Sequence, residues 1–292
     1  MPNFLLECFK CGDVDGVREA LARGADVNKT NNVKQTVLMF ASAMPSETYW
    51  SILRLLLAQP SVEVNMADEQ GKTALHAAAH CGNIEAVKLL LADQRLDVNC
   101  KDSNQITPLM MAAGKPHQID IFKLLLADQR IETNCVAPNP GSGDLTALMC
   151  AACNSNAEAA KLLLDDPRVE VNWMNSRGMT ALHVAAAQQN NVKLVELLLA
   201  HPRVDVNVKD GPLGTTVLHM AAAKNHADMA KLILAEHRFR LANDLVSVEE
   251  RSALSIAAVK ANWEVLNVLV GHPSIDLGVK HKNGATLEEL LR

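Results

Sequence analysis

Histidine and cysteine are the residues of this chain whose spacing could support catalysis or metal binding. Three histidines close a recurring four-residue phrase, TALH or TVLH, at His76, His183 and His219. A general acid or base acts once, beside a partner group, so a histidine that returns at one place of a repeated phrase indicates a structural role. The sequence also contains no phosphate-binding glycine loop, no G-x-S-x-G turn and no H-E-x-x-H pair. We therefore predict no catalytic residue and no cofactor.

Two cysteine pairs have the spacing of zinc ligands, namely Cys8 with Cys11 and Cys150 with Cys153. A structural zinc ion needs four ligands that meet at one point, whereas these pairs fall within predicted helices that are far apart in the chain. We interpret all four as small apolar or exposed thiols and predict no metal site. The seven cysteines, odd in number and scattered, indicate a reducing compartment rather than a disulfide framework.

The four-residue phrase is one sign of an internal repeat. It opens units near residues 36, 73, 107, 146, 180, 216 and 252, with a mean spacing of 36 residues. A second phrase, a leucine block followed by a hydrophobic-acid-hydrophobic-Asn close, stays in phase with it, as in LLLADQRLDVN at 89–99 and LLLAHPRVDVN at 197–207. A period of this length is typical of a solenoid built from stacked units.

Each unit reads as two antiparallel helices. After Thr73 an alanine-rich run ends at Gly82, and a second run with apolar residues at helical spacing begins at Ile84. One such pair cannot bury its own apolar side, so its stability must come from neighbouring pairs. We expect an all-α repeat solenoid of antiparallel helix pairs, forming a single domain over residues 1–292. Its expected parts are an N-terminal capping repeat at 1–28, successive repeats over 29–278, and a C-terminal cap or truncated repeat at 279–292.

These phrases resemble the ankyrin repeat family, whose T-P-L-H-x-A phrase recurs with a period of about 33 residues. The resemblance covers nearly the whole chain, and about eight units are expected. The chain departs from the family in its longer period, in its LLLAxPR linker and in the loss of the phrase near Ser252. The resemblance implies short hairpin loops between helix pairs, phrase histidines that bond the neighbouring loop backbone, and a role in protein binding.

The resemblance also implies that a partner meets the hairpin tips and the ends of the first helices. We expect partner-binding residues at both places: His80, Lys115, Asn154, Gln188, Lys224 and Lys260 at helix ends, and Gln70, Lys72, Trp173, Arg177, Met179 and Lys209 at tips. Acidic residues concentrate at the starts of the second helices, so this surface is more basic than the net charge of −5 suggests. It could attract an acidic partner segment, although ordinary solvated charges are the alternative.

An apolar residue follows the closing asparagine in five successive repeats. The residues are Met66, Cys100, Cys135, Trp173 and Val208. Packing between neighbouring hairpins explains most of this column, but a tryptophan on a hairpin, in a chain with 3% aromatic residues, is predicted to be an interface anchor. Tyr49, Trp50 and Trp263 are predicted to pack within the fold rather than to contact a partner. The longer hairpin at 136–145 either carries specificity or is tolerated drift.

The closing asparagines are first predicted to stabilise loops. They are Asn65, Asn99, Asn134, Asn172 and Asn207. Each has a leucine eight residues earlier, and the resemblance implies that this context is favoured by the asparaginyl hydroxylase that acts on the family. We therefore add these five residues as modification sites to be tested.

Composition limits the classes of protein to which the chain can belong. Hydrophobic residues make up 49% and charged residues 21%, which are globular values, and no apolar stretch approaches the length of a membrane span or signal peptide. We predict a cytoplasmic or nuclear scaffold or adaptor with a protein partner, no small-molecule substrate and no membrane. One alternative is the substrate-receptor or regulatory part of a larger enzyme, such as a ubiquitin ligase or kinase. The other is a nucleic-acid-associated regulator, disfavoured because the chain is acidic.

Overall fold

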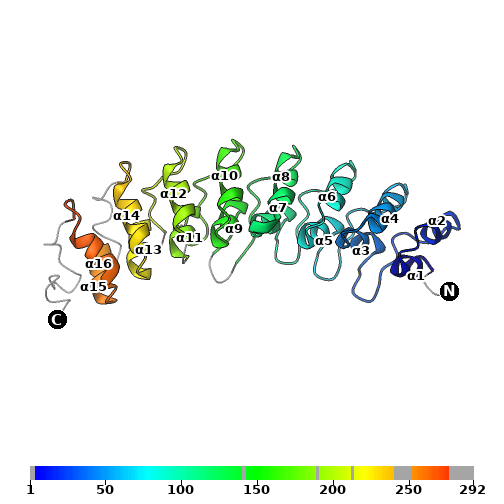
Figure 1. The fold of residues 1–292 in the computed structure, drawn as a ribbon, viewed down its shortest axis with the longest axis horizontal. Coiled ribbons are helices and arrows are strands. Elements are labelled where there is room, and N and C mark those ends of the chain that lie inside the picture. The colour runs from blue at the N-terminus through cyan, green and yellow to red at the C-terminus, as the bar shows by residue number, and fades with distance from the viewer. Residues whose placement is uncertain (1–3, 140–142, 189–190, 212–213, 240–251, 276–292) are drawn as a thin grey trace. The chain divides into compact units, whose positions relative to one another are not determined.

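The structure is a computed structural model that describes residues 4–139, 143–188, 191–211, 214–239 and 252–275. It divides into two compact units, Met1–Pro138 and Asn139–Arg292. The described residues of both units are helices joined by loops, and they form eight helix pairs, four in each unit (Figure 1). The predicted all-α repeat architecture is confirmed. The single domain over 1–292 stays a prediction, and the expected C-terminal cap at 279–292 lies outside the described residues.

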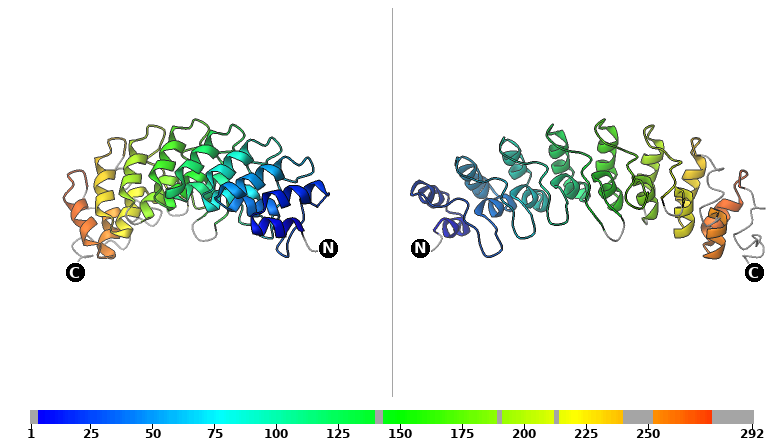
Figure 2. Two further views of the ribbon diagram at one scale, coloured as in Figure 1. Left: turned by 45° about the vertical axis from the view of Figure 1, so that its right-hand side comes forward. Right: turned by 180° about the vertical axis from the view of Figure 1, so that it is seen from behind.

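In the first unit, each repeat contributes two adjacent helices. The helices are α1 (Phe4–Cys11), α2 (Val14–Ala22), α3 (Val37–Ala43), α4 (Glu47–Leu57), α5 (Ala74–Cys81), α6 (Ile84–Leu91), α7 (Pro108–Ala113) and α8 (Ile119–Ala127), with a 3₁₀ turn η1 (Pro116–Gln118) before α8. Odd-numbered helices contact odd-numbered neighbours, and even-numbered helices contact even-numbered neighbours. Each unit thus has two helix layers, with hairpins projecting on the side of the odd-numbered helices (Figures 1 and 2).

The second unit repeats the arrangement. Its helices are α9 (Ala147–Cys153), α10 (Ala157–Asp165), α11 (Ala181–Ala187), α12 (Val192–Ala200), α13 (Val217–Lys224), α14 (Ala227–Ala235), α15 (Ala253–Val259) and α16 (Trp263–Val270). The core is again made of alanines from the odd-numbered helices and branched residues from the even-numbered ones, such as Ala185, Ala222, Leu198 and Ile233. Small side chains allow close approach of the inner layer, and leucines fill the space behind it.

Helix ends follow directly from the repeated phrase. The phrase threonine is the N-cap of α3, α5, α7, α9, α11 and α13, and Ser252 takes its place at α15. The Thr107 hydroxyl accepts a bond from Met110 N at 3.3 Å. After α5, Gly82 takes a left-handed conformation with φ of 74°, and Asn83 then caps α6. The Asn83 amide also donates to the carbonyl of Ser42 at 2.9 Å, so the cap ties one repeat to the one before it.

The arginine of the linker forms a second tie, which the sequence reasoning missed. Arg130 Nη2 lies 2.7 Å from Asp128 Oδ2 and donates at 2.8 Å to the carbonyl of Leu91, at the end of α6. Arg95 and Arg203 make equivalent bonds to the carbonyls of Leu57 and Leu164. Carbonyls in the last turn of a helix lack partners within the helix, and the guanidinium supplies them. Recurrence of Arg in this linker was the available signal.

Candidate interaction surface

The phrase histidines belong to the framework. Thr73 N donates to His76 Nδ1 at 3.3 Å, which places the ring proton on Nε2, and Nε2 donates to the Ile106 carbonyl at 3.0 Å in the next hairpin. His183 forms the same contact with the Thr215 carbonyl at 3.3 Å. Burial lowers the pKa of both rings. These histidines are therefore bonded to the neighbouring loop backbone, as the resemblance implied, and they hold hairpins rather than a reacting group.

The closing asparagines also link hairpins. Asn65 Nδ2 donates to the Arg95 carbonyl at 2.8 Å, while its Oδ1 accepts from Asp97 N at 2.8 Å. Asn99, Asn172 and Asn207 donate to the next repeat in the same way. The loop-stabilising role is confirmed for these four. Both polar atoms of the exposed Asn65 side chain are engaged in these bonds, and modification of the closing asparagines stays a prediction.

The cysteines are free thiols. Cys8 and Cys11 lie in α1, and Cys150 and Cys153 lie in α9, as predicted. Burial raises the pKa of Cys150 to about 12, so this thiol is protonated at neutral pH. Within the described ranges, no cluster of three or more His, Cys, Asp or Glu residues could hold a metal ion.

The predicted partner-binding residues lie at helix ends and hairpin tips, where most are exposed. In the first unit these are Gln70, Lys72, His80 and Lys115, and in the second unit Asn154, Trp173, Arg177, Met179, Gln188, Lys209, Lys224 and Lys260. Lys72, Lys115, Trp173, Met179 and Gln188 are half-buried, and the other seven are exposed. Acids do begin the even-numbered helices, as predicted: Glu85, Asp120, Glu158, Asp228 and Glu264 lie in their first turns, although Asp68 and Glu69 lie in a hairpin.

Two lysines are fixed at the ends of odd-numbered helices. Lys115 Nζ donates to the His80 carbonyl at 2.6 Å and lies 3.2 Å from His80 Nδ1. Lys260 Nζ donates to the carbonyl of Ala223 at 3.4 Å. Ala223 and His80 each lie seven residues after their phrase threonine, so the two lysines occupy equivalent places in different repeats. Only the first unit's lysine faces an imidazole.

The apolar column is half-buried at all five of its positions, namely Met66, Cys100, Cys135, Trp173 and Val208. This exposure agrees with packing between hairpins, and the anchor role of Trp173 stays a prediction. The neighbouring Met174 is more open, with 53% of its surface exposed. The sequence reasoning did not include Met174 among the contact residues, because a hairpin residue outside the repeated phrases carries no pattern.

Of the remaining aromatic residues, two pack as predicted and one does not. The Tyr49 ring lies 5.1 Å from that of Phe9, and Trp50 Nε1 donates to Asn83 Oδ1 at 2.9 Å. The packing prediction for Trp263 is wrong, since 55% of its surface is exposed. Trp263 is the first residue of α16 and lies outside the buried stripe formed by Val265, Leu266 and Leu269, so its side chain is not covered by the core.

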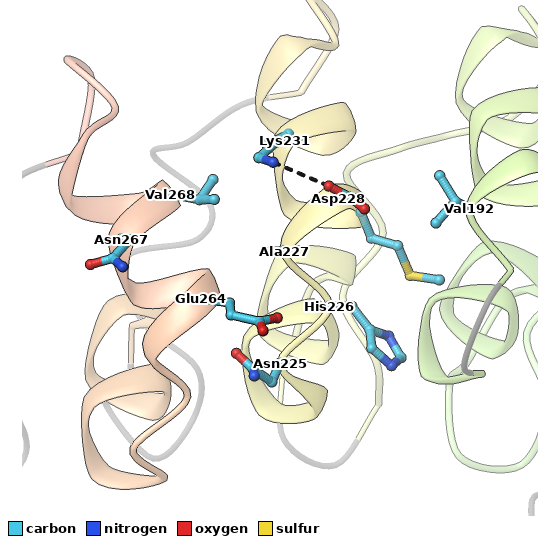
Figure 3. Close-up of a pocket in the computed structure, with 10 residues that line it drawn as sticks. Val192, Asn225, His226, Ala227, Asp228, Lys231, Glu264, Asn267 and Val268 are labelled. Atoms are coloured by element: carbon cyan, nitrogen blue, oxygen red, sulfur yellow. Dashed lines mark hydrogen bonds and ion pairs between the residues drawn. The ribbon is translucent and has the colours of Figure 1, made fainter.

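An open depression of about 600 Å³ lies between the even-numbered helices α12, α14 and α16 (Figure 3). Asp228 Oδ1 and Lys231 Nζ pair within it at 3.1 Å, and Val192 and Glu264 line its sides. His226 caps α14 and bonds through Nδ1 to a carbonyl of α11. None of the described lining residues is a Ser, Thr or Cys nucleophile. The depression is a groove between neighbouring repeats, with charges of both signs.

None of the helices in the described ranges is long and apolar enough to cross a membrane. The longer hairpin at 136–145 is described only in part: Ala137 and Leu145 at its base are buried, and 140–142 fall outside the description.

Comparison with known proteins gives the family. A family model described as ankyrin repeats in three copies matches residues 5–102, 43–139, 109–210 and 186–281. Human ankyrin repeat domain-containing protein 37 is 30% identical over 116 residues, which cover 38% of this chain and 68% of that protein. The probable E3 ubiquitin-protein ligase XBOS33 of Oryza sativa subsp. japonica is 32% identical over 160 residues, or 53% of this chain and 29% of that protein.

A second ligase relative, E3 ubiquitin-protein ligase XBAT33 of Arabidopsis thaliana, is 32% identical over 146 residues, which cover 50% of this chain and 25% of that protein. The chain thus spans less than a third of the length of either ligase relative. The family model, in contrast, matches nearly all of the chain, and its matched ranges together span the helix pairs described above. The chain belongs to the ankyrin repeat family.

Proposed function

We propose that this chain is a protein-interaction module, a scaffold or adaptor without chemistry of its own, which binds a partner through its helix ends and hairpin tips. One observation carries the proposal. The residues that recur between repeats, such as His76, Asn65 and Arg95, bond neighbouring repeats, whereas the residues at helix ends and tips differ from repeat to repeat and most are exposed. A surface that varies on a fixed framework can be specific for a partner without altering the fold.

The charge distribution favours an acidic partner segment. In the second unit, Arg177, Lys209, Lys224 and Lys260 are exposed at tips and helix ends, while acids such as Asp228 and Glu264 begin the even-numbered helices. This separation directs a positive surface toward the hairpin side, which speeds association with acidic segments and makes it salt-dependent. The free thiols favour a reducing compartment, so we place the module in the cytoplasm or nucleus.

The ligase relatives favour a second candidate, in which the chain is the substrate-receptor part of a ubiquitin ligase. The module would then select a protein that a separate catalytic domain modifies. The two candidates differ in gene structure and in biochemistry. A transcript that joins these repeats to a catalytic domain, with ubiquitylation of a captured partner, would favour the ligase.

The module is tested by affinity capture from source-cell lysate with two forms of the chain. A triple variant, Trp173→Ala with Arg177→Ala and Lys224→Ala, removes one apolar and two cationic side chains of the second unit. The comparison is valid when both forms melt at the same temperature, which excludes loss of the fold as the cause. Partners that are lost selectively support the proposal. An unchanged partner list contradicts binding through these residues and moves the site to the even-numbered helices or the 136–145 hairpin.

A further inference from the structure

We propose that Lys115 and His80, at the ends of α7 and α5, form a receptor for a glutamate or aspartate side chain of the partner, and that binding there strengthens as pH falls. The inference rests on the proposed interaction function and makes it specific to the first unit. Three observations support it: the contact between the two side chains, the surrounding charges, and an equivalent lysine without a histidine in the second unit.

The contact fixes the state of both groups. Lys115 Nζ donates to the His80 carbonyl at 2.6 Å and approaches His80 Nδ1 at 3.2 Å. Gln118 Nε2 donates to the same carbonyl at 3.2 Å. An ammonium group only donates, so Nδ1 must accept, and the imidazole is neutral with its proton on Nε2. His80 is exposed, so this N–H can donate to an incoming acceptor beside a lysine that is already held in place.

The surroundings add positive charge without an opposing acid. The Lys115 ammonium lowers the pKa of His80, with burial and the charge of Lys72 acting in the same direction. Burial also lowers the pKa of Lys115, while Cys81 acts weakly against this. In the part of the chain that the structure describes, neither group forms an ion pair with a carboxylate.

Other elements packed against α5 do not supply that acid. The α3 sequence VLMFASA has no titratable residue, and the only titratable residue of η1 is His117. Glu85 of α6 pairs with Arg54 at 3.3 Å and Lys88 at 3.8 Å. The adjoining hairpin holds Asp68, which accepts from the backbone of Lys72 at 2.9 Å, and the exposed Glu69, and neither carboxylate contributes to the pKa shift of His80. The positive charge beside His80 is therefore available to a carboxylate from outside the chain.

A bound carboxylate reverses the effect of Lys115. The carboxylate accepts a hydrogen bond from His80 Nε2–H and so favours the protonated imidazolium form of His80. In that form Nδ1 carries a proton and no longer accepts from Lys115. The Lys115 ammonium group is then free to approach the same carboxylate. His80 thus has a higher pKa in the complex than in the free chain, and binding takes up a proton. Affinity rises as pH falls through the interval between these two pKa values, and each unit of difference corresponds to about a tenfold change in the dissociation constant.

Fluorescence anisotropy with a short labelled peptide of alternating Glu and Gly tests the site in the full chain at low salt. We expect binding at about pH 5.5 to be roughly tenfold tighter than at about pH 8. Lys115→Met weakens binding at least about fivefold, and His80→Asn removes most of the pH dependence. Lys260→Met is the matched control, because its lysine donates to Ala223 without an imidazole, and it leaves the pH dependence unchanged.

Three results would overturn the inference: equal binding at both pH values, no effect of Lys115→Met, or tighter binding of a phosphoserine peptide of the same length, which would identify a phosphate receptor. NMR titration of the His80 ring gives a readout independent of any ligand. Its pKa must rise in Lys115→Met, and an unchanged value contradicts the contact. Lysate partners that are still captured by Lys115→Met chain, together with a failed peptide test, would refute this site while leaving the interaction function intact.

Discussion

Replacing Arg130 with Met tests whether the linker arginines hold repeats together. The side chain donates to the carbonyls of Leu91 at 2.8 Å and Asp93 at 3.3 Å, and it pairs with Asp128 at 2.7 Å. The two shorter of its three charge-assisted bonds to main-chain carbonyls contribute about 1 kcal/mol each in this half-buried place, and the ion pair, screened by solvent, adds about 0.5 kcal/mol. We expect Arg130→Met to lower the free energy of unfolding by about 2–3 kcal/mol.

Urea unfolding of the full chain, followed by circular dichroism, measures the change. Arg54→Met is the control, because Arg54 pairs with Glu47 and Glu85 across the surface of the even-numbered helices at 3.2 and 3.3 Å. Its loss is expected to cost about 0.5 kcal/mol. Equal effects of the two variants would refute the reasoning, because the carbonyl bonds would then contribute nothing.

The same ties predict a pH effect. Hydrogen bonds from Arg130 hold the pKa of the Asp128 carboxyl below its ordinary value of 3.8. A carboxyl with a lowered folded-state pKa contributes stability above the unfolded pKa, and this contribution is lost as pH falls through the folded one. Arg130→Met should therefore be less destabilising, relative to wild type, in strong acid than at neutral pH.

Three further predictions concern the framework. Asn65→Ala removes the hydrogen bonds to the main chain of Arg95 and Asp97, and it should lower the free energy of unfolding by about 1–2 kcal/mol. Urea unfolding measures the change. An unchanged unfolding midpoint would contradict the stabilising role of these bonds. The buried His76 has a pKa below its ordinary value of 6.5, so the unfolded chain binds one more proton than the folded chain and the free energy of unfolding falls as pH drops below 6.5. His76→Gln should flatten this part of the plot of unfolding free energy against pH. An unaltered plot would contradict the buried, neutral state of His76. Cys150 should resist iodoacetamide in the native chain while exposed Cys81 reacts, and mass spectrometry showing equal labelling would disprove the buried placement.

The architecture could be predicted from the sequence because nearly every repeat contains the same signals for its two helices. The phrase threonine and the alanine run recur with one period, and Gly82 marks the break between the two helices of its own repeat, so α5 and α6 could be located within a residue or two. His76 and Asn65 were predicted to bond loop backbone. Their partners in the next hairpin lie about 30 residues away in the sequence, and only the fold identifies them.

What the sequence did not reveal depends on three-dimensional placement. Arg130 resembles an ordinary solvated charge until the Leu91 carbonyl is seen beside it. Trp263 was predicted to pack, whereas its position at the start of α16, outside the buried stripe, leaves it exposed. Lys115 and His80 were each selected as contact residues, but their meeting depends on the stacking of α7 on α5, which no local pattern encodes.

The ties between repeats have a consequence for how such a chain can change over evolutionary time. Asn65 and Arg95 contact main-chain atoms of the adjoining repeat rather than its side chains. Every amino acid except proline offers the same main-chain donor and acceptor, so these connectors do not discriminate among neighbours. A duplicated or exchanged repeat therefore finds the same main-chain bonding groups in both neighbours. After a deletion, the two repeats that become neighbours can bond in the same way. The array can gain or lose units by genetic recombination while each unit's surface diverges independently.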